Sequence, residues 1–103
     1  MDKVVGLKEI LELDPKNSFA RYGLAMELAG RGETEAAMGE FDTLLKNDSG
    51  YTAGYFMAAL TLANAERTAE AIERLKAGID SAARSGNSHA QSEMQAMLDE
   101  LER

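Results

Sequence analysis

The amino-acid sequence contains one pattern twice. The stretch MELAGRGETEAAMGEF begins at Met26, and LTLANAERTAEAIERL begins at Leu60, 34 positions later. Four of the sixteen paired residues are identical, and the other apolar positions mostly exchange one apolar side chain for another. A period of this length is typical of helical hairpins that stack, because one hairpin cannot bury both of its apolar faces alone. The repeat therefore predicts an all-α chain of antiparallel helical hairpins.

Apolar residues three and four positions apart predict six helices. Pro15 must separate the first helix from the second, because proline cannot continue a helix. Val, Ile and Thr are too scattered to alternate with polar residues, so strands have no support. The helices are expected before Pro15, from a cap at Asn17 or Ser18 to about Ala29, from a cap at Thr34 to about Leu45, from about Thr52 to Asn64, from a cap at Thr68 to about Arg84, and over 88–102.

Length and composition exclude several classes of protein. At 103 residues we expect one domain, residues 1–103. The chain has no cysteine, which excludes disulfides and thiolate metal sites. Its formal charge of −7 would repel a nucleic-acid backbone. No stretch approaches the roughly 20 apolar residues of a membrane helix, and the start lacks the pattern of a signal peptide. We therefore expect a cytoplasmic protein without a nucleic-acid or membrane partner.

No motif for catalysis is present. His89 is the only histidine, so it lacks a second histidine or a cysteine for a metal site or a proton relay. GRGETE begins like a dinucleotide-binding loop but has Glu35 where the third glycine belongs. The sequence contains neither a Gly-x-Ser-x-Gly elbow nor a phosphate-binding GK[ST] loop. We therefore expect no catalytic residue, no metal, no cofactor and no enzyme activity.

The repeated pattern resembles that of the tetratricopeptide repeat family, W-x2-L-G-x2-Y…A-x3-F…P. The two copies read Arg21-x2-Leu24-Ala25-x2-Leu28 with Ala37-x3-Phe41, and Tyr55-x2-Ala58-Ala59-x2-Leu62 with Ala71-x3-Leu75. The closing proline is replaced by Ser49 and Ala83, whereas Pro15 follows Leu7 by eight residues as in a preceding half-repeat. Arg21 departs from the pattern, because the family prefers a large aromatic residue there.

The resemblance implies a short right-handed superhelix of stacked hairpins. It divides the chain into a half-repeat over 1–15, repeats over 18–51 and 52–85, and a capping helix over 88–102. Small residues at the pattern's alanine positions let the helices approach closely, and large ones such as Phe41 and Leu75 fill the space between neighbouring hairpins.

The resemblance also implies a protein-interaction module. In this family the first helix of each hairpin lines a concave groove, and the matching positions that are apolar here are Phe19, Tyr22, Met26, Phe56, Met57 and Leu60. Members that hold a peptide's terminal carboxylate use lysine, arginine and asparagine at these positions, and this chain has none of them there. We therefore expect an apolar peptide or helical segment of a partner protein, with lysine or arginine at its edges.

Two alternatives remain open at the level of sequence. The six apolar residues could be core, covered by the terminal helices of so short an array. The domain could instead associate with a copy of itself, through the same apolar surface or through an open N-terminal end that exposes Val4, Leu7 and Leu11. The chain could also be part of a longer protein.

Overall fold

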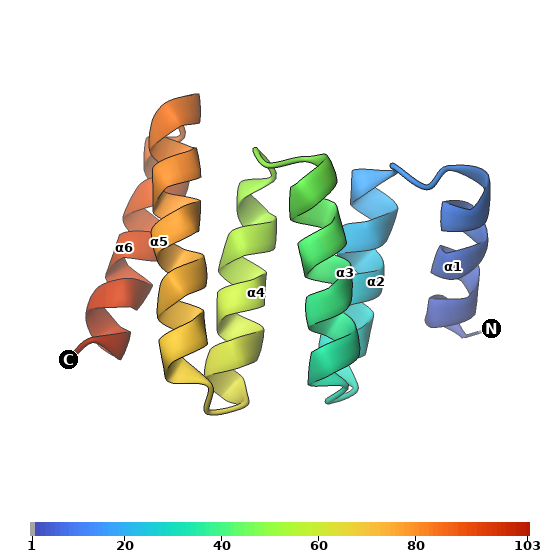
Figure 1. The fold of residues 1–103 in the computed structure, drawn as a ribbon, viewed down its shortest axis with the longest axis horizontal. Coiled ribbons are helices and arrows are strands. Elements are labelled where there is room, and N and C mark those ends of the chain that lie inside the picture. Colours follow the sequence, from blue (N-terminus) through green and yellow to red (C-terminus); the bar gives the residue numbers. More distant parts are fainter. Residues whose placement is uncertain (1) are drawn as a thin grey trace. The chain divides into compact units, whose positions relative to one another are not determined.

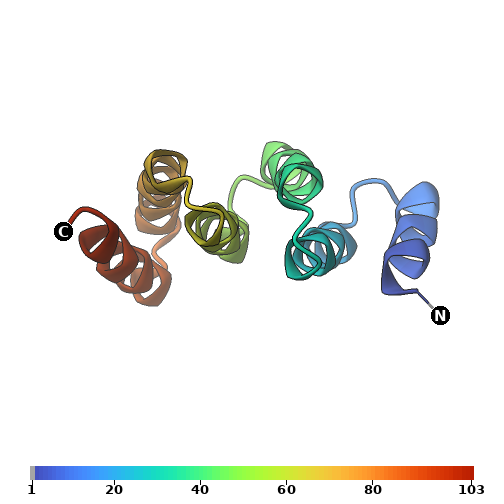
Figure 2. The ribbon, with the colours of Figure 1, turned by 90° about the horizontal axis from the view of Figure 1, so that it is seen from below.

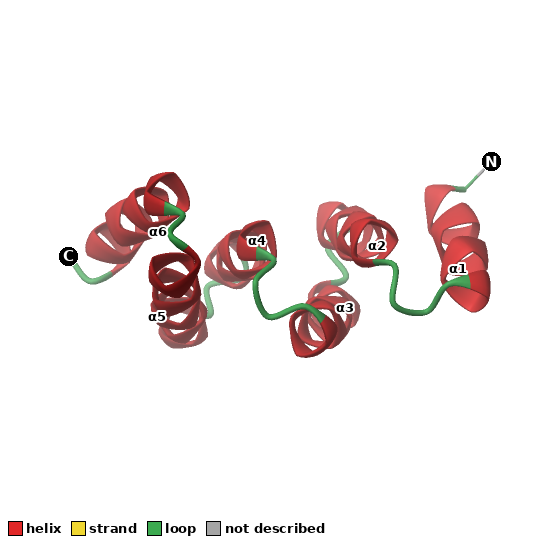
Figure 3. Ribbon diagram, turned by 90° about the horizontal axis from the view of Figure 1, so that it is seen from above, coloured by secondary structure: helices red, strands yellow, loops and turns green. Residues whose placement is uncertain are grey.

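The computed structural model describes residues 2–103, and this stretch consists of six α-helices without any strand (Figures 1 and 3). The helices are α1 (Lys3–Leu13), α2 (Ser18–Gly30), α3 (Thr34–Asn47), α4 (Thr52–Asn64), α5 (Thr68–Ser85) and α6 (Ser88–Leu101). They form two compact units, one ending at Asp48 and one beginning at Ser49, each of which is described by itself. The predicted all-α class and the six helices are confirmed, whereas the single domain and its repeat boundaries stay predictions.

In the first unit, α2 packs against both α1 and α3. Ala25 of α2 and Ala37 of α3 are fully buried, and such small side chains allow two helices to approach closely. Phe41 and Leu44 of α3 and Leu24 of α2 are the large side chains that fill this core. The alanine and phenylalanine positions of the repeat pattern are therefore packing positions, as the sequence predicts.

Helix α1 packs on α2 through Val4 and Leu11, which are buried. The sequence-based expectation that Val4, Leu7 and Leu11 line an open end is therefore wrong, since the apolar side chains that α1 exposes are Val5, Ile10 and Leu13. The reason is that Val4, Leu7 and Leu11 lie on the side of α1 that packs against α2. The spacing of apolar residues alone does not say which of two apolar sides meets a neighbour.

An ion pair secures the start of α1. Asp2 caps this helix by accepting a hydrogen bond from the Val4 amide at 2.9 Å, and the same carboxylate binds Arg31 at the end of α2. The hydrogen bond from Arg31, helped by that from Val4, holds the pKa of the Asp2 carboxyl below its usual value. The carboxylate thus stays charged and joins the start of α1 to the end of α2.

In the second unit, α5 packs against α4 and α6, and α4 also meets α6 (Figure 2). A Cβ atom added at Gly78 of α5 would lie 2.6 Å from Tyr55 Cβ of α4 and 2.5 Å from Met94 Sδ of α6. The absence of a side chain at Gly78 therefore lets the three helices meet. The apolar side of α6 points inward, since Met94 and Leu98 are buried and Met97 and Leu101 half-buried.

The helix caps agree only in part with the prediction. Asn17 caps α2, because its Oδ1 accepts a hydrogen bond from the Ala20 amide at 2.9 Å. Thr34 and Thr68 are not caps but the first residues of α3 and α5, and the N-cap residues are Glu33 and Arg67 without a side-chain cap. The turns before these helices are fixed by backbone hydrogen bonds instead, from the Glu33 amide to the Leu28 carbonyl (3.0 Å) and from the Arg67 amide to the Leu62 carbonyl (2.9 Å).

The two hairpin turns differ at one position of the repeat. Gly32 has a φ of 78°, and Glu66, 34 residues later, has a φ of 63°. The left-handed conformation costs a residue with a Cβ about 1–2 kcal/mol, whereas glycine adopts it freely. We expect Glu66→Gly to raise the free energy of unfolding by about 0.5–1 kcal/mol after its larger unfolded-state entropy is counted, as measured by urea denaturation. Glu66→Ala, which keeps the strain, should give no such gain. A Glu66→Gly variant no more stable than Glu66→Ala would contradict this account.

Candidate functional site

The first three predicted site residues form one stripe of α2, which we call the α2 patch. Phe19, Tyr22 and Met26 lie three and four positions apart and therefore share one side of the helix. Phe19 is 80% exposed, and Tyr22 and Met26 are half-buried. The remaining sides of α2 carry its buried residues, Ala20, Leu24, Ala25 and Leu28. The α2 patch is thus the apolar side of α2 that lies outside the core.

The other three residues form the α4 patch on the second unit. Phe56, Met57 and Leu60 are half-buried, whereas Gly54, Ala58, Ala59, Thr61 and Leu62 of the same helix are buried. Helix α4 contains no charged residue, so no charge on this helix interrupts the apolar side. None of the six predicted side chains is fully buried. The sequence-based assignment of the two patches to one binding surface stays a prediction.

The two arginines of the α2 segment are engaged in ion pairs. Arg21 Nη1 lies 2.7 Å from Glu40 Oε1, and its Nη2 donates to the Pro15 carbonyl at 2.8 Å. Arg31 pairs with Asp2 and lies 3.8 Å from Glu27. Because these guanidinium groups already have carboxylate partners, the α2 patch presents apolar side chains without an uncommitted arginine beside it. This arrangement suits an apolar ligand better than a carboxylate.

Arg21 also borders a hollow in the first unit. The cavity has a volume of about 300 Å³ and is lined by Lys8, Leu11, Glu12, Arg21, Leu24 and Glu40. It lies at the position where the repeat pattern prefers a large aromatic side chain. The sequence shows this departure but not the Arg21–Glu40 pair, because the two residues are 19 positions apart and meet only when α2 packs on α3. The cavity's charged lining belongs to α1, α2 and α3.

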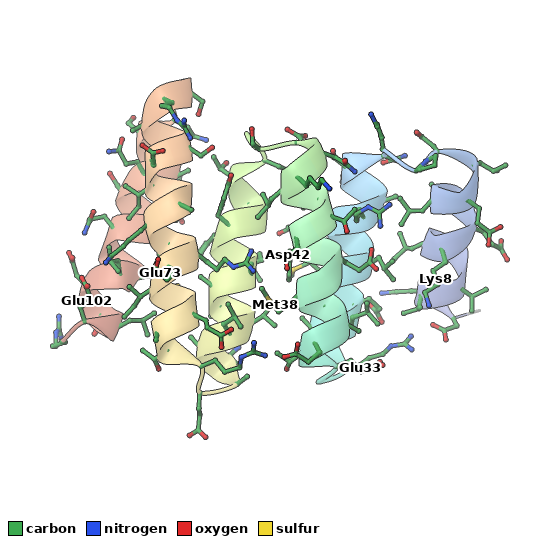
Figure 4. The ribbon with its side chains drawn as sticks, viewed as in Figure 1. Lys8, Glu33, Met38, Asp42, Glu73 and Glu102 are labelled. Carbon is green, nitrogen blue, oxygen red and sulfur yellow. The ribbon has the colours of Figure 1, made fainter. Side chains whose placement is uncertain are left out.

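Charged side chains elsewhere lie on the outside of the helices. Figure 4 shows Glu73 on α5, Glu33 in the turn before α3 and Glu102 just after α6, and all three are exposed. Within residues 2–103, no group of three or more His, Asp or Glu side chains is placed to hold a metal ion. His89 is exposed in the first turn of α6, with its Nε2 at 3.4 Å from Glu93 Oε1. None of the helices in this described stretch is long and apolar enough to span a membrane.

Comparison with known proteins identifies the fold. No protein-family model matches the sequence, and no curated protein matches it either. Among solved structures, a tetratricopeptide repeat domain protein from Salinibacter ruber is 29% identical, with a TM-score of 0.79 over 86% of this chain and 90% of the other.

Two further structures share the fold at lower identity. A protein from Bordetella parapertussis is 22% identical, with a TM-score of 0.85 over 100% of this chain and 90% of the other. The type III secretion translocator chaperone SycD from Yersinia enterocolitica is 20% identical, with a TM-score of 0.82 over 93% of this chain and 67% of the other. The resemblance that the two-copy pattern predicts is thereby confirmed, since the chain has the fold of tetratricopeptide repeat domains.

Proposed function

We propose that this chain is a non-catalytic module that binds a peptide or helical segment of a partner protein through the α2 patch and the α4 patch. The observation that carries the proposal is the incomplete burial of all six apolar side chains on helices whose other sides are packed. Exposed apolar surface of this kind commonly marks a protein-interaction site. SycD, which shares this fold, is a translocator chaperone, and this supports a protein partner here as well.

The chemistry of the patches indicates the class of ligand. Tyr22 and Phe56 are large side chains with few rotatable bonds, so they are suited to anchor an apolar segment. Met26 and Met57 are flexible and can adapt to its shape. The chain's formal charge of −7 favours a ligand with lysine or arginine beside its apolar residues, chiefly by accelerating encounter. The proposed ligand is therefore an apolar or amphipathic segment with basic flanks.

The double variant Tyr22→Ala with Phe56→Ala tests this proposal. Anchor residues each contribute about 2 kcal/mol or more to a typical interface, so we expect the dissociation constant to rise about a hundredfold or more. The measurement is fluorescence anisotropy with a panel of labelled amphipathic peptides that carry lysine at both ends, first screened for binding to the wild type. Helical circular dichroism should be unchanged, because both side chains are only half-buried and lie outside the fully buried core.

Leu13→Ala is the matched control, since Leu13 is an exposed apolar residue outside both patches. It should leave peptide affinity unchanged. Equal affinity of the wild type and the double variant, or absence of binding across the panel, would contradict the proposal. Loss of the helical signal in the double variant would show that the two residues are core. Self-association through the same patches would instead appear as a fall in the mass of the protein in solution on double substitution.

A further inference from the structure

Helix α1 exposes a stripe of residues that lies about a quarter to a third of a turn around the helix from the side that packs on α2. We call this the α1 stripe, and it consists of Lys3, Gly6, Ile10, Leu13 and Asp14. Ile10 is 45% exposed and Leu13 is 90% exposed, although both are large and apolar. A Cβ added at Gly6 would meet nothing within 4 Å. The α1 stripe is therefore an apolar surface with a shallow point at its glycine and a charged residue at each end.

The equivalent side of α3 and of α5 is covered by a neighbouring helix. Ile10, Leu44 and Gly78 are separated by 34 residues each and so occupy the same place in successive repeats. Leu44 is only 1% exposed, and Gly78 is buried with Tyr55 of α4 directly against it. Glu40, equivalent to Gly6, forms its ion pair with Arg21 of α2. In α3 and α5 this side thus meets the first helix of the same hairpin, whereas in α1 it meets no helix.

The charges of the α1 stripe are complementary to those of a second copy. Lys3 and Asp14 are 11 positions apart, or about 16 Å along a helix, and have opposite signs. Two antiparallel copies of α1 in which Lys3 lies level with Asp14 of the other copy therefore form an ion pair at both ends at once. A helix with basic flanks would instead bring a like charge to Lys3. Within residues 2–103, neither Lys3 nor Asp14 takes part in an ion pair.

The same antiparallel register also brings apolar groups together. On the stripe of the second copy, Ile10 falls between the levels of Gly6 and Ile10, and Leu13 falls between the levels of Lys3 and Gly6. Helical side chains lean toward the N-terminus of their own helix, so Leu13 reaches toward the level of residues 5 and 6 of the other copy. The bare backbone at Gly6 provides room for it. Both apolar residues that the α1 stripe exposes are therefore covered in one arrangement.

We propose that two copies of this chain associate through their α1 stripes, antiparallel about a two-fold axis, with Lys3 of each copy paired with Asp14 of the other. This contact uses neither the α2 patch nor the α4 patch, so it is independent of the proposed peptide binding. One short helix from each copy buries less surface than a standard stable interface, so we expect a weak dimer with a dissociation constant of about 10 μM to 1 mM.

Sedimentation equilibrium over about 10 μM to 3 mM covers that range of affinity and measures the association. Ile10→Lys should weaken association about a hundredfold, because it places two unpaired ammonium groups in the contact. Val5→Lys is the matched control: it adds the same charge at a similarly exposed apolar residue of α1 that lies off the stripe. It should leave the association constant within a factor of about two, since exposed charges interact weakly at a distance.

Charge reversal tests the proposed register. Lys3→Asp should weaken association about tenfold, because it turns both attractive end pairs into repulsive ones. Adding Asp14→Lys to this variant should restore association, since it exchanges the two signs at each pair. A protein that stays monomeric at the highest concentration would overturn the proposal. Equal effects of Ile10→Lys and Val5→Lys, or failure of the double reversal to restore association, would overturn it as well.

Two variants distinguish the α1 contact from the proposed peptide binding. Tyr22→Ala with Phe56→Ala should leave the monomer–dimer equilibrium unchanged, whereas Ile10→Lys should leave peptide affinity unchanged. A dimer that dissociates on substitution of Tyr22 and Phe56 but not of Ile10 would place the contact on the patches and overturn the α1 assignment.

Discussion

Phe41→Ala is expected to lower the free energy of unfolding by about 3–5 kcal/mol, a large share of the roughly 5–15 kcal/mol typical of a domain. Phe41 is fully buried in α3, and it is among the largest side chains of the core. Truncation removes its transfer free energy and leaves a cavity, because the surrounding core relaxes only partly. The measurement is urea denaturation followed by circular dichroism at 222 nm.

Phe41→Leu is the control for this prediction. Leucine stands at the equivalent place of the next repeat, where Leu75 is likewise fully buried. This substitution keeps most of the apolar volume and should cost less than about 1.5 kcal/mol. An alanine variant within 1 kcal/mol of wild type, on the scale of a typical single substitution, would show that Phe41 does not hold the hairpin together.

Gly78→Ala is expected to lower the free energy of unfolding by about 1–3 kcal/mol even though alanine is the better helix former. The added methyl group would lie 2.6 Å from Tyr55 Cβ and 2.5 Å from Met94 Sδ. The thioether of Met94 can move, but Tyr55 Cβ is fixed to the backbone of α4, so α4 and α5 must separate. The same denaturation experiment measures this cost.

Gly39→Ala supplies the matched comparison. Gly39 lies inside α3, is exposed and has nothing within 4 Å of an added Cβ. The substitution should therefore raise the free energy of unfolding by about 0.5–1 kcal/mol through helix propensity alone. Opposite signs for Gly78→Ala and Gly39→Ala are the expected result. A gain in stability at both positions would mean that α4, α5 and α6 tolerate a wider spacing.

The sequence predicts the helices well because their limits depend on local chemistry. Pro15 must lie outside a helix, and Gly32 and Gly86 both adopt the positive φ that ends one. The 34-residue period then pairs the helices into hairpins, since equivalent positions repeat the same burial: Ala37 with Ala71, and Phe41 with Leu75. These features require no knowledge of distant contacts.

Other features depend on contacts that periodicity does not contain. Val4 and Leu11 are spaced like any apolar pair, and only the packing of α1 on α2 decides that they are buried while Ile10 is exposed. Glu66 adopts a positive φ because the surrounding turn repeats that of Gly32, not because glutamate favours it. The pairing of Arg21 with Glu40 likewise follows from tertiary packing.

The candidate site depends on a different kind of information. Phe19 and Leu24 are both large and apolar, yet one is 80% and the other 2% exposed. Composition alone does not separate them. Their places in the repeat distinguish the two residues, because the pattern assigns Leu24 to packing, and the family resemblance implies that Phe19 lies on the open side. For the proposed ligand, the sequence encodes only a chemical class, through apolar and aromatic side chains on a chain of formal charge −7.

In both units, helices that pack together are also close together in the sequence. The packed helix pairs within them are α1 with α2, α2 with α3, α4 with α5, α5 with α6 and α4 with α6, so that even the most distant pair, α4 with α6, is separated by a single helix. Bringing such segments together closes only short loops and costs little chain entropy before contacts form. Each hairpin can therefore assemble as soon as its second helix leaves the ribosome, without waiting for the rest of the chain.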